Sequence, residues 1–174
     1  MATLQKITTQ LWFDSNAEEA VKFYTSIFKN SSVGRIAYYG KVGFEQHHRP
    51  AGSVMTVEFT IEGQDFLAIN AGPIFKFNES ICFIIYCDTQ DEIDYYWGKL
   101  TNGGDKSAQI CGWLKDRYGV SWQVSFSDFP DMIVNEKGSE KTERVLGALY
   151  KMHKIDIETL KKAYEGEYDK AISG

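Results

Sequence analysis

The side chains that most often do chemistry in proteins are sparse in this sequence, and their spacing matches no catalytic arrangement. His47 and His48 are adjacent in a predicted polar loop, where two neighbouring imidazoles cannot readily point at one metal ion. No third ligand stands beside them, so a polar loop is the preferred interpretation. Cys111 could be a nucleophile, but no His or Asp adjoins it, and a free cysteine is more often a small buried hydrophobe.

The remaining candidates have structural explanations. Cys82 and Cys87 fall in an apolar predicted strand and are expected to pack in the core, and His153 lies in a charged segment and is expected to be exposed. Asp116 and Arg117 are expected to be turn residues, paired with each other or with a partner subunit. No Ser-His-Asp order, phosphate-binding loop or paired-carboxylate spacing is present, so the residues alone name no catalytic apparatus.

The composition describes a folded, acidic protein and excludes several classes of partner. The 174 residues are 43% hydrophobic and 14% aromatic, which excludes a disordered chain. The net charge of −5 disfavours nucleic acid, which is bound through an excess of Lys and Arg. The apolar runs are shorter than the roughly 20 residues that span a bilayer, and the N-terminus lacks the layout of a signal peptide. Three cysteines without CxxC spacing indicate neither a disulfide framework nor a zinc knuckle, so we expect a soluble cytoplasmic protein.

Two segments of the chain carry the same pattern of a strand, a helix cap and an amphipathic helix. In the first half, Ile7–Phe13 predicts a strand, and Ser15 with Glu18 fits a capping box at the start of the following helix. In the second half, Ile81–Cys87 predicts a strand, and the same cap begins at Thr89. A unit that recurs at this separation indicates a duplicated module.

Each half is predicted to be a βαβββ module. Alternating hydrophobicity over 54–61 predicts a half-buried strand, followed by a hairpin turn at 62–64 and a returning strand at 66–70. The second half repeats this order in shorter form, with its last strand at 120–126. The difference in length is mostly the polar loop from Gly40 to Gly52.

After Pro130 the sequence changes character. Residues 136–170 carry eight acidic and eight basic side chains, with apolar residues at helical spacing. We expect a domain over 1–130, with modules at about 5–72 and 79–128, and a helical extension over 131–174. The extension is expected to cover a sheet face or a partner subunit.

Two βαβββ modules in one chain resemble the vicinal oxygen chelate superfamily, which includes glyoxalases, extradiol dioxygenases and drug-binding resistance proteins. The chain resembles more specifically the PhnB-like branch, whose members are often labelled demethylubiquinone methyltransferase domains. The matching runs cover nearly the whole chain: 11–14, 16–20, 52–59, 75–79, 111–119, 121–123 and the tail around 154–157. The resemblance implies an α+β fold of two βαβββ modules, whose curved mixed sheets surround a cavity, with a C-terminal helical extension. It also implies a homodimer.

Enzymes of this superfamily hold a divalent metal with His and carboxylate side chains from the first and last strands of each module. The resemblance places four residues at these positions: Gln10, Asn70, Phe83 and Gln123. Neutral amides bind Zn²⁺, Fe²⁺ or Ni²⁺ poorly, and a phenyl ring does not bind them at all. We therefore expect neither a bound metal nor another cofactor.

The same positions are where the resemblance places a ligand. The residues expected to contact it come from strands or from the link between the modules: Gln10, Trp12, Asn70, Phe75, Phe77, Asn78, Phe83, Trp113, Trp122 and Gln123. The amides could orient a ligand or be satisfied inside a sheet, and the tryptophans could wall an apolar pocket or pack in the core. The link residues could join the modules or form a lip toward the pocket of a paired subunit.

Two functions remain open from the sequence. The first is metal-independent binding of a small, partly apolar molecule, and the second is an enzyme of lyase, isomerase or dioxygenase type. The residues at the four inherited positions favour binding. Both strand-to-helix turns, at 14–16 and 88–89, lack the glycines with which a typical methyltransferase holds S-adenosylmethionine, so the methyltransferase label is treated as a family name.

Overall fold

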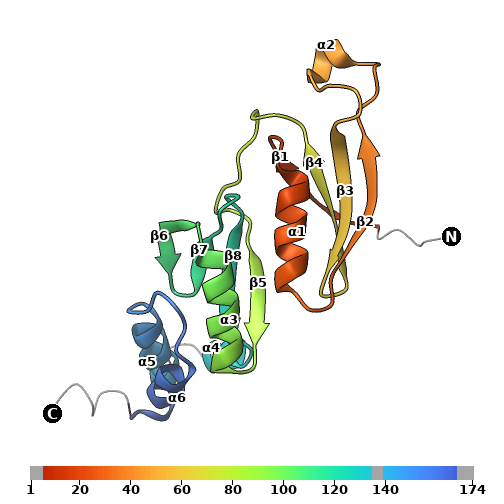
Figure 1. The fold of residues 1–174 in the computed structure, drawn as a ribbon. Helices are drawn as coiled ribbons and strands as arrows, with labels where there is room; N and C mark the ends of the chain where they lie inside the picture. The colour runs from red at the N-terminus through yellow and green to blue at the C-terminus, as the bar shows by residue number, and fades with distance from the viewer. Residues whose placement is uncertain (1–5, 135–138, 168–174) are drawn as a thin grey trace. The chain divides into compact units, whose positions relative to one another are not determined.

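The computed structural model describes residues 6–134 and 139–167, and it divides the chain into two compact units, Met1–Phe77 and Asn78–Gly174. Each unit contains one four-stranded mixed sheet (Figure 1). The predicted α+β fold of two βαβββ modules with C-terminal helices is confirmed. The N-terminal segment without signal-peptide layout and parts of the expected extension, at 135–138 and 168–174, lie outside the described residues.

The first unit carries its sheet in the order β1-β4-β3-β2. Its elements are β1 (Thr9–Phe13), α1 (Ala17–Ile27), β2 (Ser32–Tyr38), α2 (Phe44–His47), β3 (Val54–Ile61) and β4 (Gln64–Asn70). β1 runs parallel to β4, and the other neighbours are antiparallel. The expected polar loop therefore contains one short helix, α2, which sequence analysis did not predict.

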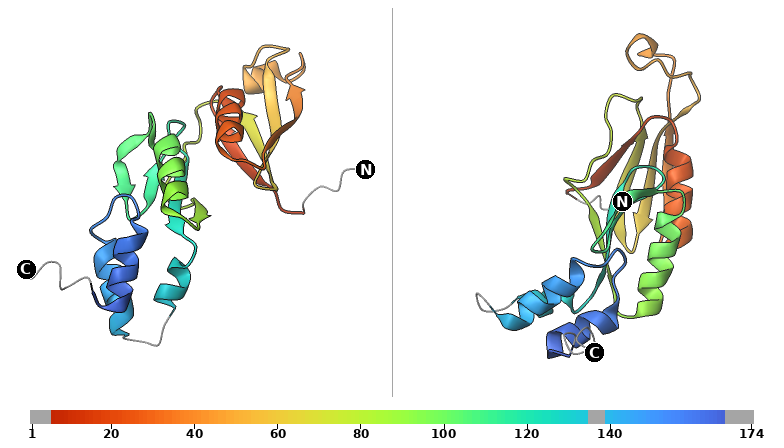
Figure 2. Two further views of the ribbon diagram at one scale, coloured as in Figure 1. Left: turned by 60° about the horizontal axis from the view of Figure 1, so that its bottom comes forward. Right: turned by 90° about the vertical axis from the view of Figure 1, so that its left-hand side faces the viewer.

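Helix α1 covers one face of this sheet because its apolar residues recur at helical spacing (Figures 1 and 2). Tyr24 is fully buried and its ring lies 6.4 Å from that of Phe59 on β3. Leu11, Phe13 and Phe66 are buried on the same side. Since successive strand residues point to opposite faces, the residues between them lie on the other side of the sheet.

The second unit repeats this arrangement with the strand order β5-β8-β7-β6. Its elements are β5 (Phe83–Cys87), α3 (Gln90–Thr101), β6 (Asp105–Ile110), β7 (Trp113–Lys115) and β8 (Ser121–Phe126). Helix α3 packs against β5, β7 and β8 through the fully buried Ile93 and Leu100. β5 pairs in parallel with β8, as β1 does with β4.

The extension forms α4 (Phe129–Ile133), α5 (Glu140–Leu149) and α6 (Ile157–Glu165). The segment between α5 and α6 is hydrogen-bonded to the turn between β6 and β7 and to α3. The backbone N–H groups of Cys111 and Gly112 donate to Met152 and His153, and Gln90 on α3 donates to the carbonyl of Ile155 at 3.1 Å. Among the described helices of the chain, none has the length and apolar character to cross a bilayer.

The predicted helix caps have different outcomes. The capping box at Ser15 and Glu18 is wrong, because α1 begins at Ala17 without a local side-chain cap. The cap at Thr89 is confirmed: its hydroxyl accepts from the Glu92 N–H at 3.2 Å, and the Glu92 carboxylate accepts from the N–H of Asp88. The two helices differ because α1 is capped by a buried side chain from a distant strand, whereas α3 is capped by a local residue.

Asp116, expected as a turn residue, organises the β7–β8 hairpin as a buried carboxylate. It is 3% exposed and accepts hydrogen bonds from the N–H groups of Tyr118 and Val120, at 2.8 and 3.0 Å. Its other oxygen accepts from the indole N–H of Trp122 at 2.9 Å. Several N–H donors therefore converge on one buried charge, which fixes the turn and the position of Trp122.

We expect Asp116→Asn to destabilise the protein by about 2–3 kcal/mol, because an amide group has N–H donors of its own and cannot accept all the hydrogen bonds that Tyr118, Val120 and Trp122 donate to the carboxylate. The change is measured by urea unfolding followed by circular dichroism. Asp105→Asn is the matched control, since Asp105 is exposed and accepts only from Ser107, a turn that Asn also supports. A loss in the control as large as that in Asp116→Asn would refute the assignment.

Candidate functional site

In the first unit, the sheet face opposite α1 combines an amide with apolar side chains. We call this surface, formed by Gln10, Trp12, Leu67 and Ile69, the Gln10 face. Gln10 is exposed and registers with Leu67, and the half-buried Trp12 registers with Ile69. The indole N–H of Trp12 donates to the carbonyl of Gly72 at 2.9 Å, which leaves its ring as apolar surface.

Phe75 extends the Gln10 face. Its ring packs edge-on against Trp12, with 4.9 Å between the ring centroids, and it is 63% exposed. Glu58 registers with Leu67 on this face and is bound by Arg35 through two hydrogen bonds of 2.6 and 2.8 Å. The hydrogen bonds from Arg35 lower the pKa of Glu58, so its carboxylate stays charged and paired. The surface is therefore mainly apolar, with Gln10 as its exposed amide.

In the second unit, the sheet face opposite α3 has a related composition. We call this surface, formed by Ile84, Tyr86, Trp113 and Gln123, the Gln123 face. Gln123 registers with Ile84 on one side and with Trp113 on the other, so its amide lies between two apolar side chains. Ile84 is 45% exposed and Tyr86 is 56% exposed. Sequence analysis did not single out Ile84, Tyr86, Leu67 or Ile69, although strand alternation could have placed them here.

Three of the strand residues expected to contact a ligand lie on the helix-covered faces instead: Asn70, Phe83 and Trp122. Asn70 is 5% exposed; its side-chain oxygen accepts from the N–H of Ala17 at 2.9 Å, and its amide group donates to Val54 at 3.1 Å. Phe83 packs against Trp122 with 5.2 Å between ring centroids. Asn70 therefore fixes the start of α1, and Trp122 belongs to the core beneath α3, with the half-buried Phe83 against its ring.

The link residues serve different purposes. Phe77 packs edge-on against Phe13, with 5.3 Å between ring centroids, on the covered side of the first sheet. Asn78 closes a local turn, in which its side-chain oxygen accepts from the N–H of Ser80 at 3.0 Å. Of the three link residues, Phe75 alone lies against the Gln10 face.

The thiols show no sign of activation. Cys87 is 1% exposed, and burial raises its pKa to about 12. Burial also raises the pKa of Cys111, whose thiol donates to the carbonyl of Leu149. A reactive cysteine needs a lowered pKa, so neither thiol has the environment of a nucleophile. Within residues 6–134 and 139–167, no three His, Cys, Asp or Glu side chains gather as metal ligands would.

Sequence analysis also missed a polar cavity of about 350 Å³ at the start of α1. Its lining includes Ser15, Glu18, Arg49 and Ser53, together with the already bonded Asn70. Arg49 donates from one guanidinium nitrogen to the carboxylate of Asp14 at 2.8 Å. The charge of Arg49 in the cavity is thus largely balanced by this carboxylate. The sequence carries no signal for the cavity, because Arg49 lies in the long loop.

We expect Asn70→Ala to lower the free energy of unfolding by about 2 kcal/mol, because it leaves the Ala17 N–H and the Val54 carbonyl without their partner. Gln10→Ala, the same change on the exposed face, should alter stability by less than about 0.5 kcal/mol. Urea unfolding of both variants measures the difference. Equal losses would contradict the division into a structural and an exposed amide.

Comparison with known proteins agrees with the fold. The family described as 3-demethylubiquinone-9 3-methyltransferase matches residues 5–125. A PhnB protein from Bacillus cereus, provisionally assigned the same methyltransferase description, is 36% identical over 70% of this chain and 99% of its own, with a TM-score of 0.61. A protein from Pseudomonas aeruginosa is 20% identical over 71% of this chain and 98% of its own, with a TM-score of 0.52, and shares the fold.

A search of curated proteins gave no match. The family match covers both βαβββ modules and stops before the helical extension. The resemblance to PhnB-like proteins inferred from the sequence is confirmed. The chain therefore belongs to the 3-demethylubiquinone-9 3-methyltransferase family and is a PhnB-like protein.

Proposed function

We propose that this protein binds a small, partly apolar molecule without a metal ion, and that an amide on a sheet face orients it: Gln10 in the first unit and Gln123 in the second. The observation that carries the proposal is the pairing of an amide with a tryptophan on the face of each sheet opposite its helix: Gln10 with Trp12, and Gln123 with Trp113. Ligand sites in proteins are mainly apolar, with a few polar groups that fix orientation.

The chemistry of these surfaces favours a ring that carries oxygen substituents. A glutamine amide both donates and accepts hydrogen bonds, so it can bind a carbonyl, hydroxyl or methoxy oxygen. A tryptophan ring offers a large flat surface for stacking. The family description names a demethylated ubiquinone, which combines an oxygen-substituted ring with an apolar tail. A ubiquinone analogue is therefore the first probe we would choose.

The methyltransferase activity in the family description is a second candidate function. The residues at the two strand-to-helix turns do not favour it, because neither turn holds a glycine-rich loop for a nucleotide cofactor. At the start of α1 the Ala17 N–H already binds Asn70, and at α3 the Glu92 N–H binds Thr89. An enzyme of lyase, isomerase or dioxygenase type would need metal ligands beyond the four inherited positions.

We also propose that two copies pair in the cytoplasm, as the family resemblance implies. Edge strand β2 supports pairing, since its Val33 and Tyr38 are 46% and 57% exposed and exposed apolar edges favour association. The free cysteines of the described chain suit a reducing compartment. Sedimentation velocity should give a dimer at micromolar concentration, and a monomer would contradict the pairing.

We expect a fully substituted ubiquinone analogue with a short alkyl tail to bind in isothermal titration calorimetry, with chelator present throughout. Gln10→Ala should weaken binding to the face of the first unit, and Gln123→Ala binding to the face of the second, each about fivefold, the loss of roughly one hydrogen bond. Gln64→Ala is the matched control, because Gln64 is an exposed amide at the start of β4. Equal weakening by the control, or binding only after a divalent metal is added, would overturn the proposal.

We expect no heat from titration with S-adenosylmethionine, because the two helix starts lack the cofactor loop. Micromolar binding of S-adenosylmethionine would instead favour the methyltransferase. A rise in melting temperature with a divalent metal alone would favour an enzyme of lyase, isomerase or dioxygenase type, since a ligand that binds the native state raises the melting temperature of the protein.

A further inference from the structure

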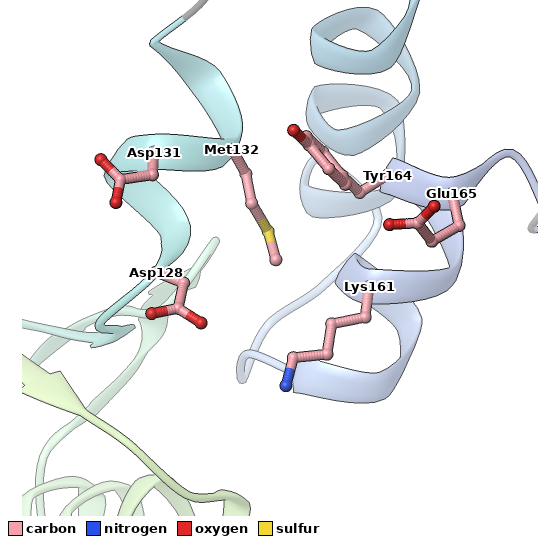
Figure 3. Close-up of a pocket in the computed structure, with 6 residues that line it drawn as sticks. All are labelled: Asp128, Asp131, Met132, Lys161, Tyr164 and Glu165. Carbon is pink, nitrogen blue, oxygen red and sulfur yellow. The ribbon is translucent and has the colours of Figure 1, made fainter.

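The helical extension contains an open cavity that lies outside the part of the chain matched by the family. The cavity has a volume of about 440 Å³ and lies between α4 and α6 (Figure 3). Six residues line it: Asp128, Asp131, Met132, Lys161, Tyr164 and Glu165. The family match ends at residue 125, so the family description says nothing about this cavity. Its volume lies within the range of about 300–1,000 Å³ that is typical of small-molecule sites.

The cavity has an apolar wall on each side. Met132, which is 8% exposed, extends from α4 into the space between the helices, and Tyr164 extends from α6 toward it (Figure 3). The thioether of a methionine adapts to differently shaped apolar groups. The aliphatic stem of Lys161 adds further apolar surface at the lower end of the view in Figure 3. A short hydrocarbon chain would therefore find contacts on both helices.

Among the six lining residues, the carboxylates outnumber the ammonium groups. Asp128, Asp131 and Glu165 bring three carboxylates, and Lys161 brings one ammonium group. In the described residues, no ion pair or side-chain hydrogen bond uses any of these three carboxylates, whereas Glu158 on the same helix α6 is paired with Lys162. Unpaired negative charge beside an apolar wall raises the local concentration of cations.

This region already holds two of the protein's own ammonium groups against aromatic rings. The Lys161 nitrogen lies 5.0 Å from the centre of the Phe126 ring, and the Lys141 nitrogen lies 4.6 Å from the centre of the Tyr164 ring. Such contacts are favourable because the face of an aromatic ring is electron-rich. Tyr164, which lines the cavity, is therefore a ring that already contacts an ammonium group.

We propose that this cavity binds an organic ammonium ion that carries a short apolar chain. The carboxylates attract the ammonium group, and Met132 with Tyr164 contacts the chain. An anion of the same length would meet the excess of carboxylates, and a neutral molecule would gain only the apolar contacts. The site is separate from the Gln10 and Gln123 faces and does not depend on the function proposed for them.

Calorimetric titration of the full chain tests the ligand class with three probes of one chain length: hexylammonium, hexanol and hexanoate. We expect heat from hexylammonium in the millimolar range, weakened by added salt, and a markedly smaller response from the other two. Equal binding of hexanol would contradict the preference for a cation and leave only an apolar groove. Binding of hexanoate, or no measurable heat from any of the three probes, would overturn the proposal.

Variants of the lining residues test the location. Asp131→Asn and Glu165→Gln should each weaken hexylammonium binding about threefold to fivefold, the size of an exposed ion pair. Lys161→Gln should strengthen binding, because it removes the ammonium group that opposes the ligand. Glu158→Gln is the matched control, since its carboxylate is on α6 but pairs with Lys162 outside the cavity.

Thermal melting first confirms that each variant is folded, which is expected because the altered side chains are exposed. Gln10→Ala should leave hexylammonium binding unchanged, so failure here is distinguishable from failure of the proposal for the sheet faces. Loss of affinity in Glu158→Gln equal to that in Glu165→Gln, or weaker binding in Lys161→Gln, would contradict the proposed site.

Discussion

The side chain of Asn70 fixes the first N–H of α1 to the end of β4 and the backbone of Val54 on β3, and the arrangement of the first unit depends on this interaction. Without it, the buried start of the helix would leave its N–H unpaired, which is costly in an apolar environment. Because α1 is held at this point, Tyr24 lies over Phe59 and the helix covers one face of the sheet. The opposite face is thereby left for Gln10 and Trp12.

In the second unit, the start of α3 is held by a neighbouring residue and by the C-terminal extension. Thr89 caps α3 from its own chain neighbourhood, and Gln90 binds the backbone of Ile155 and Ile157 in the extension. Ile155 itself is 2% exposed. The extension is thus part of the fold of the second unit, which it joins near the start of α3. These contacts hold α5 and α6 beside the cavity next to α4.

The strands and helices of this fold could be predicted from the sequence because they depend on local patterns. Alternation along β3, helical spacing along α1 and the hydroxyl-to-carboxylate cap of α3 all involve residues within a few positions of one another. The cap by Asn70 joins residues 53 positions apart, and no local pattern encodes it. The sequence predicts Asp116 only as a turn residue, because Asp is common in turns whether its carboxylate is exposed or buried.

The candidate site was harder to predict for a geometric reason. A position shifted by one residue along a strand lies on the opposite face of the sheet. A resemblance that assigns the strands correctly therefore does not by itself show which side chains converge. Gln10 registers with Leu67, and two residues further Trp12 registers with Ile69. Asn70, one residue beyond Ile69, lies on the covered side. The same offset separates Trp122, beneath α3, from Gln123.

This offset bears on whether a metal site could exist at the four inherited positions. Gln10 and Asn70 lie on opposite faces of the first sheet, and Phe83 and Gln123 lie on opposite faces of the second. Ligands of one ion must converge within about 2 to 2.6 Å of it, which side chains on opposite sheet faces cannot do. Restoring His or Glu at all four positions would therefore not bring together the two members of either pair. Gln10 and Trp12 register with the apolar Leu67 and Ile69, and the carboxylate of Glu58 on this face is already bound by Arg35, which supports the proposal of an organic ligand rather than an ion.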